Sequence, residues 1–177
     1  MKTVVIYKSK TGFTKKYAEW IAEDLAADIF EVSKVNSSTI TKYDAIIYGG
    51  SLYATGIIGV KFLKKNIDKL MDKRVIVFAC GASPANEVVL KEVITHNFTS
   101  DQQKHIKFFY LRGGFNYDKL SLFDKVLMTL FKWKIVLKKR IKKKLDSDEI
   151  GMLEAYDKPV NFTERRNIER IVAYVNS

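Results

Sequence analysis

Short apolar segments alternate along the chain with amphipathic ones. Four runs are rich in Val, Ile, Phe and Tyr and show little polar alternation, which is typical of strands covered on both faces. These runs are residues 3–7, 45–48, 74–79 and 107–111. A weaker alternating run at residues 29–35 predicts an edge strand.

Helical periodicity fills the gaps between these strands. Apolar side chains recur every three or four residues over residues 14–25 and 60–71, which places them on one face of each predicted helix. Residues 85–94 form another predicted helix, entered through Ser83 and Pro84. A final amphipathic helix is predicted over residues 163–175, with Asn161 or Thr163 as its N-cap.

This alternation of strands and helices predicts an α/β protein whose parallel sheet is covered on both faces. A chain of 177 residues suits one domain, so we expect a single domain over residues 1–177. The single cysteine, Cys80, excludes an intrachain disulfide, and with only two histidines we expect no metal centre. The N-terminus enters an apolar strand at once and lacks the pattern of a secretory signal, which predicts a cytoplasmic protein.

The loop after the first strand has the composition of an anion site. It consists of Ser9, Lys10, Thr11, Gly12, Phe13 and Thr14 and leads directly into a helix. Hydroxyl groups and backbone N–H groups at a helix N-terminus bind phosphate. Neither GxxxxGK[ST] nor GxGxxG is present, so the pattern does not support a nucleoside triphosphate loop or a dinucleotide fingerprint. A polar turn that caps the helix is an equally good interpretation of this loop alone.

Right-handed crossovers bring the next loops to the same edge of the sheet, where they favour a flat ring. One loop presents an aromatic side chain and consists of Ser51, Leu52, Tyr53, Ala54, Thr55 and Gly56. The second is made of small residues, namely Cys80, Gly81, Ala82 and Ser83. In the loop after the last strand, Arg112 has the charge to hold a substrate carboxylate, and Tyr117 is a candidate contact for flavin or substrate. A phosphate cradle beside a slot for a flat heterocycle favours FMN as the cofactor.

The run Ser9-x-Thr11-Gly12-x-Thr14 resembles the phosphate loop of the flavodoxin family. The resemblance implies a flavodoxin-like three-layer sandwich, with a five-stranded parallel sheet in the order 2-1-3-4-5. It implies that residues 9–14 bind the FMN phosphate, that residues 51–56 line the flavin ring and that residues 80–83 form the second ring loop.

Within this family, the chain resembles the menaquinone-dependent protoporphyrinogen IX dehydrogenase type. The similarity lies in residues 1–3, 43–44, 50–53 and 62–65, and above all in residues 112–119 followed by 122–125. It implies an FMN-dependent oxidoreductase of heme biosynthesis, which passes electrons from a reduced substrate through FMN to a quinone or a similar acceptor. The flavin then carries the chemistry, and no side chain is a catalytic residue. The alternative is a flavodoxin-type electron-transfer module that docks a redox partner protein.

Most of the net charge of +11 comes from residues 119–145, which hold ten basic residues and one acid, Asp124. We expect this segment to be an amphipathic helical insertion after the fifth strand, with a break or turn near Trp133 because Lys134 falls on the apolar face. That face comprises Phe123, Val126, Leu127, Leu130, Leu137, Ile141 and Leu145, and the opposite face comprises Lys125, Lys132, Lys139 and Lys143.

Two interpretations of this basic segment stay open. The helix either packs on the domain with a solvated lysine face, or lies on an anionic membrane surface, peripheral at the inner face of the cell membrane. Nucleic acid is not an expected partner, because no recognised reading module accompanies the charge.

Overall fold

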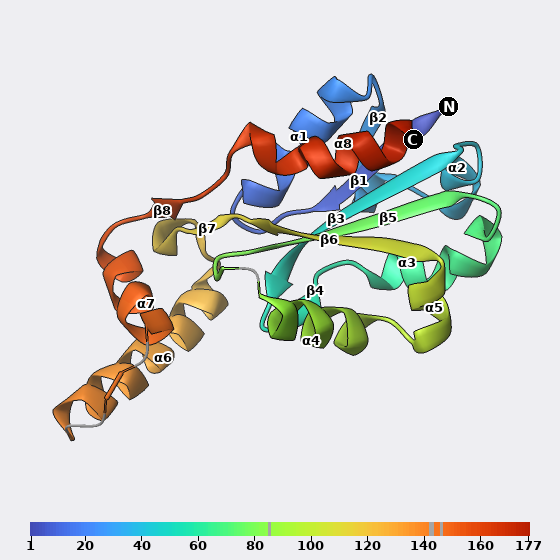
Figure 1. Cartoon of the computed structure of the whole chain (residues 1–177). Helices are drawn as coiled ribbons and strands as arrows, with labels where there is room; N and C mark the ends of the chain where they lie inside the picture. Colours follow the sequence, from blue (N-terminus) through green and yellow to red (C-terminus); the bar gives the residue numbers. More distant parts are fainter. Residues whose placement is uncertain (85, 142–143, 146) are drawn as a thin grey trace.

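Parallel strands form the centre of the molecule (Figure 1). The computed structural model describes residues 1–84, 86–141, 144–145 and 147–177. The sheet order is β2-β1-β3-β5-β6, which is 2-1-3-4-5 for the five parallel strands in chain order and confirms the predicted topology. The strands are β1 (Thr3–Lys8), β2 (Asp28–Glu31), β3 (Ala45–Tyr53), β5 (Arg74–Gly81) and β6 (Ile106–Arg112).

Helices cover both faces of this sheet, as the unbroken apolar runs of the strands require. On one face, α1 (Phe13–Asp24) and α8 (Glu169–Asn176) pack over a core that includes Ile47, Ile76 and Phe78. On the other face, α2 (Ser37–Ile40), α3 (Lys61–Asn66) and α4 (Glu87–Asn97) pack around Tyr48 and Val77, and α5 (Ser100–Lys104) leads into β6. Figure 1 shows these two layers on either side of the strands.

Two predicted elements before the middle of the chain are wrong in extent. The edge strand ends at Glu31, and a 3₁₀ helix, η1 (Val32–Lys34), takes the place of its predicted second half. The helix predicted over residues 60–71 is divided into α3 and a second 3₁₀ helix, η2 (Ile67–Leu70). Both changes tighten the chain at the end of an element, where 3₁₀ turns are common.

The predicted starts of two later helices are also wrong. Helix α4 begins at Glu87, and its N-cap is Asn86, whose side chain accepts a hydrogen bond from Val89 N at 2.9 Å. Ala85, the predicted first residue of that helix, lies outside the described residues. The last helix is preceded by η4 (Arg165–Ile168), and the side chain of Asn161 accepts from Thr163 N instead of capping it.

Residues 116–159 are here called the insert, and its described residues extend beyond the edge of the sheet, between β6 and α8 in the chain (Figure 1). A small antiparallel ribbon, β7 (Gly114–Phe115) with β8 (Val160–Asn161), joins the two ends of the insert. After η3 (Tyr117–Lys119), helices α6 (Leu122–Arg140) and α7 (Ser147–Asp157) pack against each other. The sequence predicted neither α7 nor the ribbon.

Helix α6 runs without interruption through Trp133 and Lys134, so the predicted break is wrong. Its inward side carries Asp124 and Ile135, which are buried, while most of the predicted apolar side faces outward and Leu127 lines a cavity instead. The outward side chains are each between 58% and 84% exposed; we call Leu122, Phe123, Val126, Leu130, Trp133, Leu137 and Ile141 the apolar face of α6. Every helix within the described ranges is too short or too polar to cross a bilayer.

Two lysines of α6 pack against α7, which offers them partners. Lys132 Nζ lies 4.9 Å from the centroid of the Tyr156 ring, and Lys138 Nζ forms a 2.6 Å ion pair with Glu149. Tyr156 also donates a hydrogen bond to Met128 O and packs edge-on against Phe115 with ring centroids 5.7 Å apart. Long lysine stems can cover apolar surface while their ammonium groups reach a partner. Of the predicted lysine face, Lys132 is thus packed, Lys139 is exposed and Lys143 lies outside the described residues.

Candidate functional site

The loop between β1 and α1 ends at a helix N-terminus that no side chain caps within the described part of the chain. Its N-cap is Gly12, whose φ of 96° lies in the left-handed region that favours glycine. The regular helical bonds begin where Lys16 N donates to Gly12 O at 3.0 Å, so the preceding N–H groups need other acceptors. A helix start of this kind attracts an anion through its N–H groups and its dipole.

Two of the three hydroxyl groups of this loop, those of Ser9 and Thr14, are engaged within the protein. Ser9 Oγ accepts from Gly12 N at 3.1 Å, which closes the turn. Thr14 is fully buried, and its hydroxyl shares a 2.7 Å hydrogen bond with Ser51 Oγ. Ser51 Oγ also accepts from Lys10 N at 3.3 Å. The hydroxyls of Ser9 and Thr14 therefore brace this loop, whereas Thr11 lines the neighbouring cavity, and the N–H groups at the start of α1 have the geometry of an anion site.

A hairpin between β3 and β4 (Gly56–Ile57) places an aromatic ring beside this loop. Tyr53 is 45% exposed, and Lys10 Nζ lies 4.1 Å from the centroid of its ring, which is a cation–π distance. Asn97 Nδ2 donates to Thr55 O at 2.7 Å and ties the hairpin to α4. One face of the Tyr53 ring is thus covered by an ammonium group.

The loop after β5 brings a buried thiol to the same place. Cys80 is 6% exposed, and burial raises the pKa of its thiol to about 12. A Cβ added at Gly113 would lie 2.5 Å from Cys80 Sγ, so glycine is required for the backbone after β6 to pass this close. Cys80 therefore behaves as a small, inert wall residue of the site.

Alkylation tests this description of Cys80. We expect iodoacetamide at pH 8 to label the native protein at least ~10-fold more slowly than the urea-unfolded protein, because only the thiolate reacts. Thiol labelling followed by mass spectrometry measures both rates on the single cysteine of the chain. Equal rates in the native and unfolded states would show that the thiol is accessible and ionised.

The three loops and the insert surround a cavity of about 440 Å³. Eleven predicted site residues line it: Lys10, Thr11, Phe13, Thr14, Ser51, Leu52, Tyr53, Ala54, Cys80, Gly81 and Ala82. Its other wall consists of residues that the sequence pattern did not indicate: Gly114, Phe115, Leu120, Asp124, Leu127, Met128, Phe131 and Met152. Most of that wall belongs to the insert, so the insert is part of the site.

Five of the predicted cofactor-binding residues, all within the described ranges, do not line this cavity. Ser9 and Gly12 shape the turn before α1, and Thr55 and Gly56 belong to the hairpin after β3. Ser83 lines a second, larger cavity of about 1110 Å³, which shares Ala82, Phe115, Phe131 and Met152 with the first. The two cavities therefore meet along a common wall.

The two candidate substrate residues are separated by the structure. Arg112 lines the larger cavity. Tyr117 lies in the insert, where its hydroxyl shares a 2.8 Å hydrogen bond with Thr129 Oγ1 and its ring centroid is 5.5 Å from that of Tyr156. Among the described residues that line the two cavities, Tyr117 is absent. Its contacts hold the insert together.

Comparison with known proteins identifies the family to which this sheet and these loops belong. The family model for the flavodoxin domain matches residues 4–144, which extend from β1 beyond the end of α6. This chain belongs to the flavodoxin domain family.

Individual relatives of this flavodoxin-domain protein are distant. The uncharacterized protein MJ0298 of Methanocaldococcus jannaschii is 28% identical over 128 residues, which are 70% of this chain and 83% of that protein. A WrbA-like flavodoxin from Agrobacterium tumefaciens has 22% identity and a TM-score of 0.50, covering 70% of this chain and 87% of that chain. Reduced Megasphaera elsdenii flavodoxin has 16% identity and a TM-score of 0.47, covering 61% of this chain and 82% of that chain.

FMN is the cofactor that the flavodoxin domain implies, and the observed site suits it. The uncapped start of α1 offers N–H donors for a phosphate, and the cavity of about 440 Å³ has the size usual for a small-molecule site. The walls at Leu52, Tyr53 and Phe115 are apolar or aromatic, as a flat ring requires. The family thus makes this a protein of FMN-linked electron transfer or oxidoreduction.

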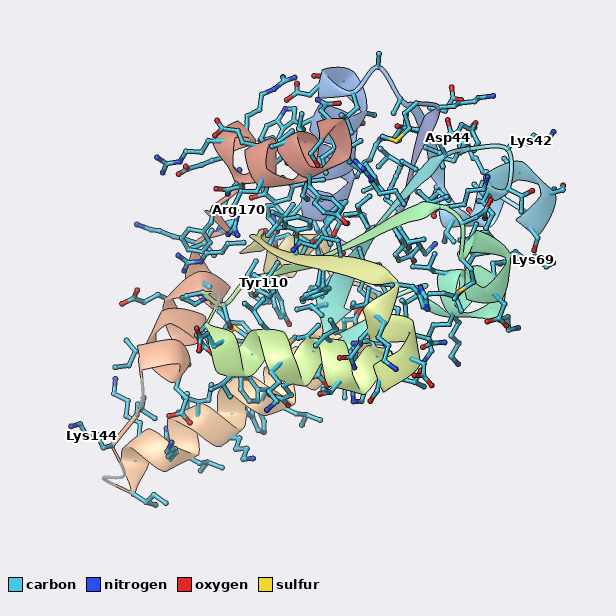
Figure 2. The ribbon with its side chains drawn as sticks, turned by 45° about the vertical axis from the view of Figure 1, so that its right-hand side comes forward. Lys42, Asp44, Lys69, Tyr110, Lys144 and Arg170 are labelled. Carbon is cyan, nitrogen blue, oxygen red and sulfur yellow. The ribbon has the colours of Figure 1, made fainter. Side chains whose placement is uncertain are left out.

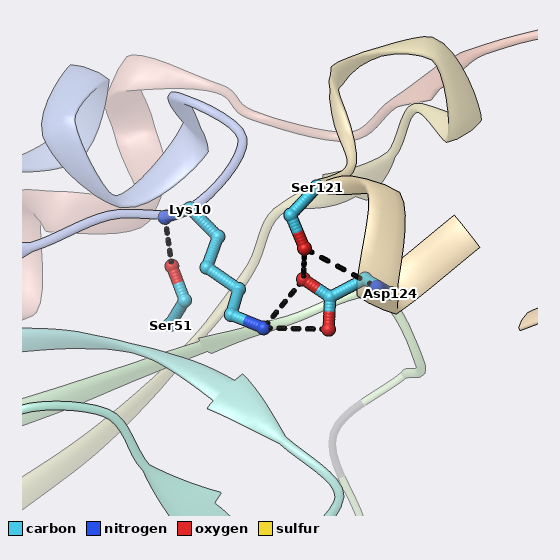
Figure 3. Close-up of polar contacts among 4 residues, drawn as sticks. All are labelled: Lys10, Ser51, Ser121 and Asp124. Atoms are coloured by element: carbon cyan, nitrogen blue, oxygen red, sulfur yellow. Dashed lines mark hydrogen bonds and ion pairs between the residues drawn. The ribbon is translucent and has the colours of Figure 1, made fainter. Parts of the chain in front are cut away.

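An ion pair joins the phosphate loop of this flavodoxin-domain protein to the insert (Figure 3). Lys10 Nζ donates to both carboxylate oxygens of Asp124, at 2.9 and 2.7 Å, and Ser121 Oγ donates to the same carboxylate at 2.8 Å. The hydrogen bonds from Lys10 and then Ser121 hold the pKa of Asp124 below its usual range. Asp124 is 5% exposed, so the pair lies under the insert and fixes the first turn of α6 over the cofactor cavity.

Proposed function

We propose that this protein is an FMN-dependent oxidoreductase that takes electrons from a small reduced substrate and passes them to a quinone or a similar acceptor. The observation that carries the proposal is the larger cavity beside the cofactor cavity, with Ala82, Phe115, Phe131 and Met152 shared by both. A cavity of about 1110 Å³ next to the flavin gives a small molecule room to reach the ring.

The chain contributes binding, orientation and exclusion of water, while FMN supplies the transfer of hydride or electrons. The N–H groups that start α1 would hold the phosphate, and the small residues 80–82 would line the flavin ring. Phe131 from α6 and Met152 from α7 form the part of the wall on the insert side that the two cavities share.

We propose the protoporphyrinogen IX dehydrogenase type as the specific activity. Its support is the sequence resemblance of residues 112–119 and 122–125, which supply Arg112 to the larger cavity and Asp124 to the cofactor cavity. The resemblance thus falls on residues that build the site.

The alternative is an electron carrier whose basic insert docks an acidic redox partner. A carrier needs an exposed flavin edge but no substrate cavity, so the large second cavity favours the enzyme.

Titration with FMN followed by anaerobic reduction tests the proposal. We expect the protein to acquire the visible absorption of bound flavin, and protoporphyrinogen to bleach it in the absence of any reductase. Added quinone should then restore the oxidised spectrum. A protein that stays colourless overturns the cofactor assignment, and a flavin reduced only by a partner reductase overturns the enzyme in favour of the carrier.

The exposed apolar face of α6 supports a further proposal, contact with an anionic membrane surface. This face includes Trp133 and Phe123, and the helical wheel places Lys134 and Arg140 at its two margins. Figure 2 shows Lys144 at the far end of the insert, away from the sheet. Aromatic and aliphatic side chains bordered by cations are the pattern of an interfacial helix. A second copy of the chain fits less well, because pairing these faces would bring two basic helices together.

Vesicle sedimentation tests this contact. We expect vesicles that contain phosphatidylglycerol to retain the protein at low salt, and Leu130→Asp to weaken retention about 10-fold, because a charge replaces buried apolar area. Val88→Asp is the matched control, since Val88 is 75% exposed on α4. Retention that neither Leu130→Asp nor high salt weakens would overturn the membrane proposal, as would a stable dimer that buries α6.

A further inference from the structure

The larger cavity is a distinct site with its own walls. It lies between the loop that follows β5, the end of β6, the β7–β8 ribbon and the insert. Its apolar lining includes Pro84, Phe115, Phe131, Met152, Ala155, Val160 and Phe162. A lining of this kind accommodates the apolar body of an organic ligand rather than an inorganic ion.

One half-buried cation is built into this apolar wall. The Arg112 guanidinium lies 3.6 Å from the centroid of the Phe162 ring, and its Nε donates to Ala82 O at 3.2 Å. Its backbone is fixed as well, because Tyr17, which is fully buried, donates from its hydroxyl to Arg112 O at 2.6 Å. The side chain is therefore held from two sides before any ligand arrives.

Arg112 has no carboxylate partner among the described residues. Of the two acids that line the cavity, Glu149 is paired with Lys138, and Glu154 is exposed. Lys158, at the same cavity, adds a second positive charge. A guanidinium stays charged at every physiological pH, and its terminal amino groups match the two oxygens of a carboxylate.

We infer that the larger cavity binds an organic acid with an apolar body, and that Arg112 holds its acid group. The ring stacking and the Ala82 contact leave the terminal amino groups of Arg112 as the donors for this anion. Because the cavity shares a wall with the cofactor cavity, the ligand lies beside the flavin. The role of this ligand as a redox substrate rests on the proposed function, whereas its binding does not.

Binding of 1-pyrenebutyrate tests the inference, with the uncharged 1-pyrenebutanol as the comparison ligand. We expect the protein to bind the acid at least ~10-fold more tightly than the alcohol, since a charge-assisted hydrogen bond is lost with the alcohol. Arg112→Gln should abolish this preference and leave the affinity for the alcohol unchanged. Arg170→Gln, on the surface of α8 (Figure 2), is the matched control and should keep the preference.

A second variant locates the ligand independently of its charge. Gly151 lines the cavity, and a Cβ there would meet no heavy atom within 4 Å, so Gly151→Trp should fill the cavity without disturbing the fold. We expect it to weaken both pyrene ligands. In protein loaded with FMN, pyrene emission should be quenched, because the flavin lies next to the cavity.

Three results would overturn the inference: equal affinity for acid and alcohol, an unchanged preference in Arg112→Gln, or unchanged binding in Gly151→Trp. Both ligands are also titrated into protein without FMN. A protein that binds the acid through Arg112 but takes up no FMN would refute the proposed function alone, and the reverse pattern would refute this inference alone.

Discussion

A Gly12→Val variant should bind FMN about 100-fold more weakly than the parent protein, which corresponds to about 2.7 kcal/mol. Gly12 has a φ of 96°, and a β-branched residue is strained there by about 1–2 kcal/mol. To relieve that strain, the backbone before α1 rotates, and this rotation displaces the N–H groups that bind the phosphate. Each hydrogen bond to a charged group contributes about 1.5–3 kcal/mol, so the loss of one or two accounts for the effect.

Riboflavin, which lacks the phosphate, separates this effect from general damage. The parent protein should prefer FMN to riboflavin, and Gly12→Val should lose that preference while it binds riboflavin as before. Gly151→Ala is the control. Gly151 lies in α7 and is not among the described residues that line the cofactor cavity. A correctly folded Gly12→Val protein with undiminished preference for FMN would show that the phosphate is held elsewhere.

Loss of the Lys10 ammonium should destabilise the protein more than loss of the Asp124 charge. Lys10→Met leaves a carboxylate with a side chain only 7% exposed without its cation, and we expect a cost of about 2 kcal/mol. Ser121 and the N-terminus of α6 still stabilise that carboxylate. The loss in unfolding free energy is therefore smaller than the largest losses seen when a buried ion pair is broken. Asp124→Asn leaves Lys10, with a side chain 36% exposed, free to turn toward water, so it should cost less.

Urea unfolding of both single variants and of the double variant measures the coupling of the pair. The double variant should be more stable than Lys10→Met alone. The folded-state pKa of Asp124 is lowered, so the pair contributes stability above the unfolded pKa of about 3.9 and loses it as pH falls through the folded value. The cost of Lys10→Met should therefore shrink below about pH 4. A cost that is independent of pH, or additive single effects, would contradict the assigned pair.

The central sheet was predictable because its signals are local. Runs such as residues 4–7 and 75–79 are apolar throughout because helices cover both of their faces, and this pattern needs no knowledge of distant residues. The meeting of the loops at one edge of the sheet followed from the predicted topology alone, and eleven of the residues predicted there line one cavity. Element ends were less predictable because they depend on caps such as Asn86, which compete with neighbouring candidates.

The insert shows where local pattern fails. A helical wheel identifies the two faces of α6 but not which of them packs, and that choice depends on Tyr156 and Glu149 of a helix that had no clear pattern of its own. The ion pair between Lys10 and Asp124 spans 114 positions, beyond the reach of any periodicity. One signal was available: Asp124 is the single acid among the ten basic residues of this segment.

The short ribbon at the base of the insert makes the insert separable from the sheet. Phe115 pairs directly with Val160, so the chain leaves and returns at one point. Helix α8, which follows, takes its core contacts from Ile171 and Val175 against the sheet and α1. A two-residue turn joining positions 115 and 160 would replace everything between them. One segment thus carries one wall of the cofactor cavity, one wall of the acid-binding cavity and the apolar face of α6, so it can be exchanged as a unit while the sheet, the phosphate loop and Arg112 stay in place.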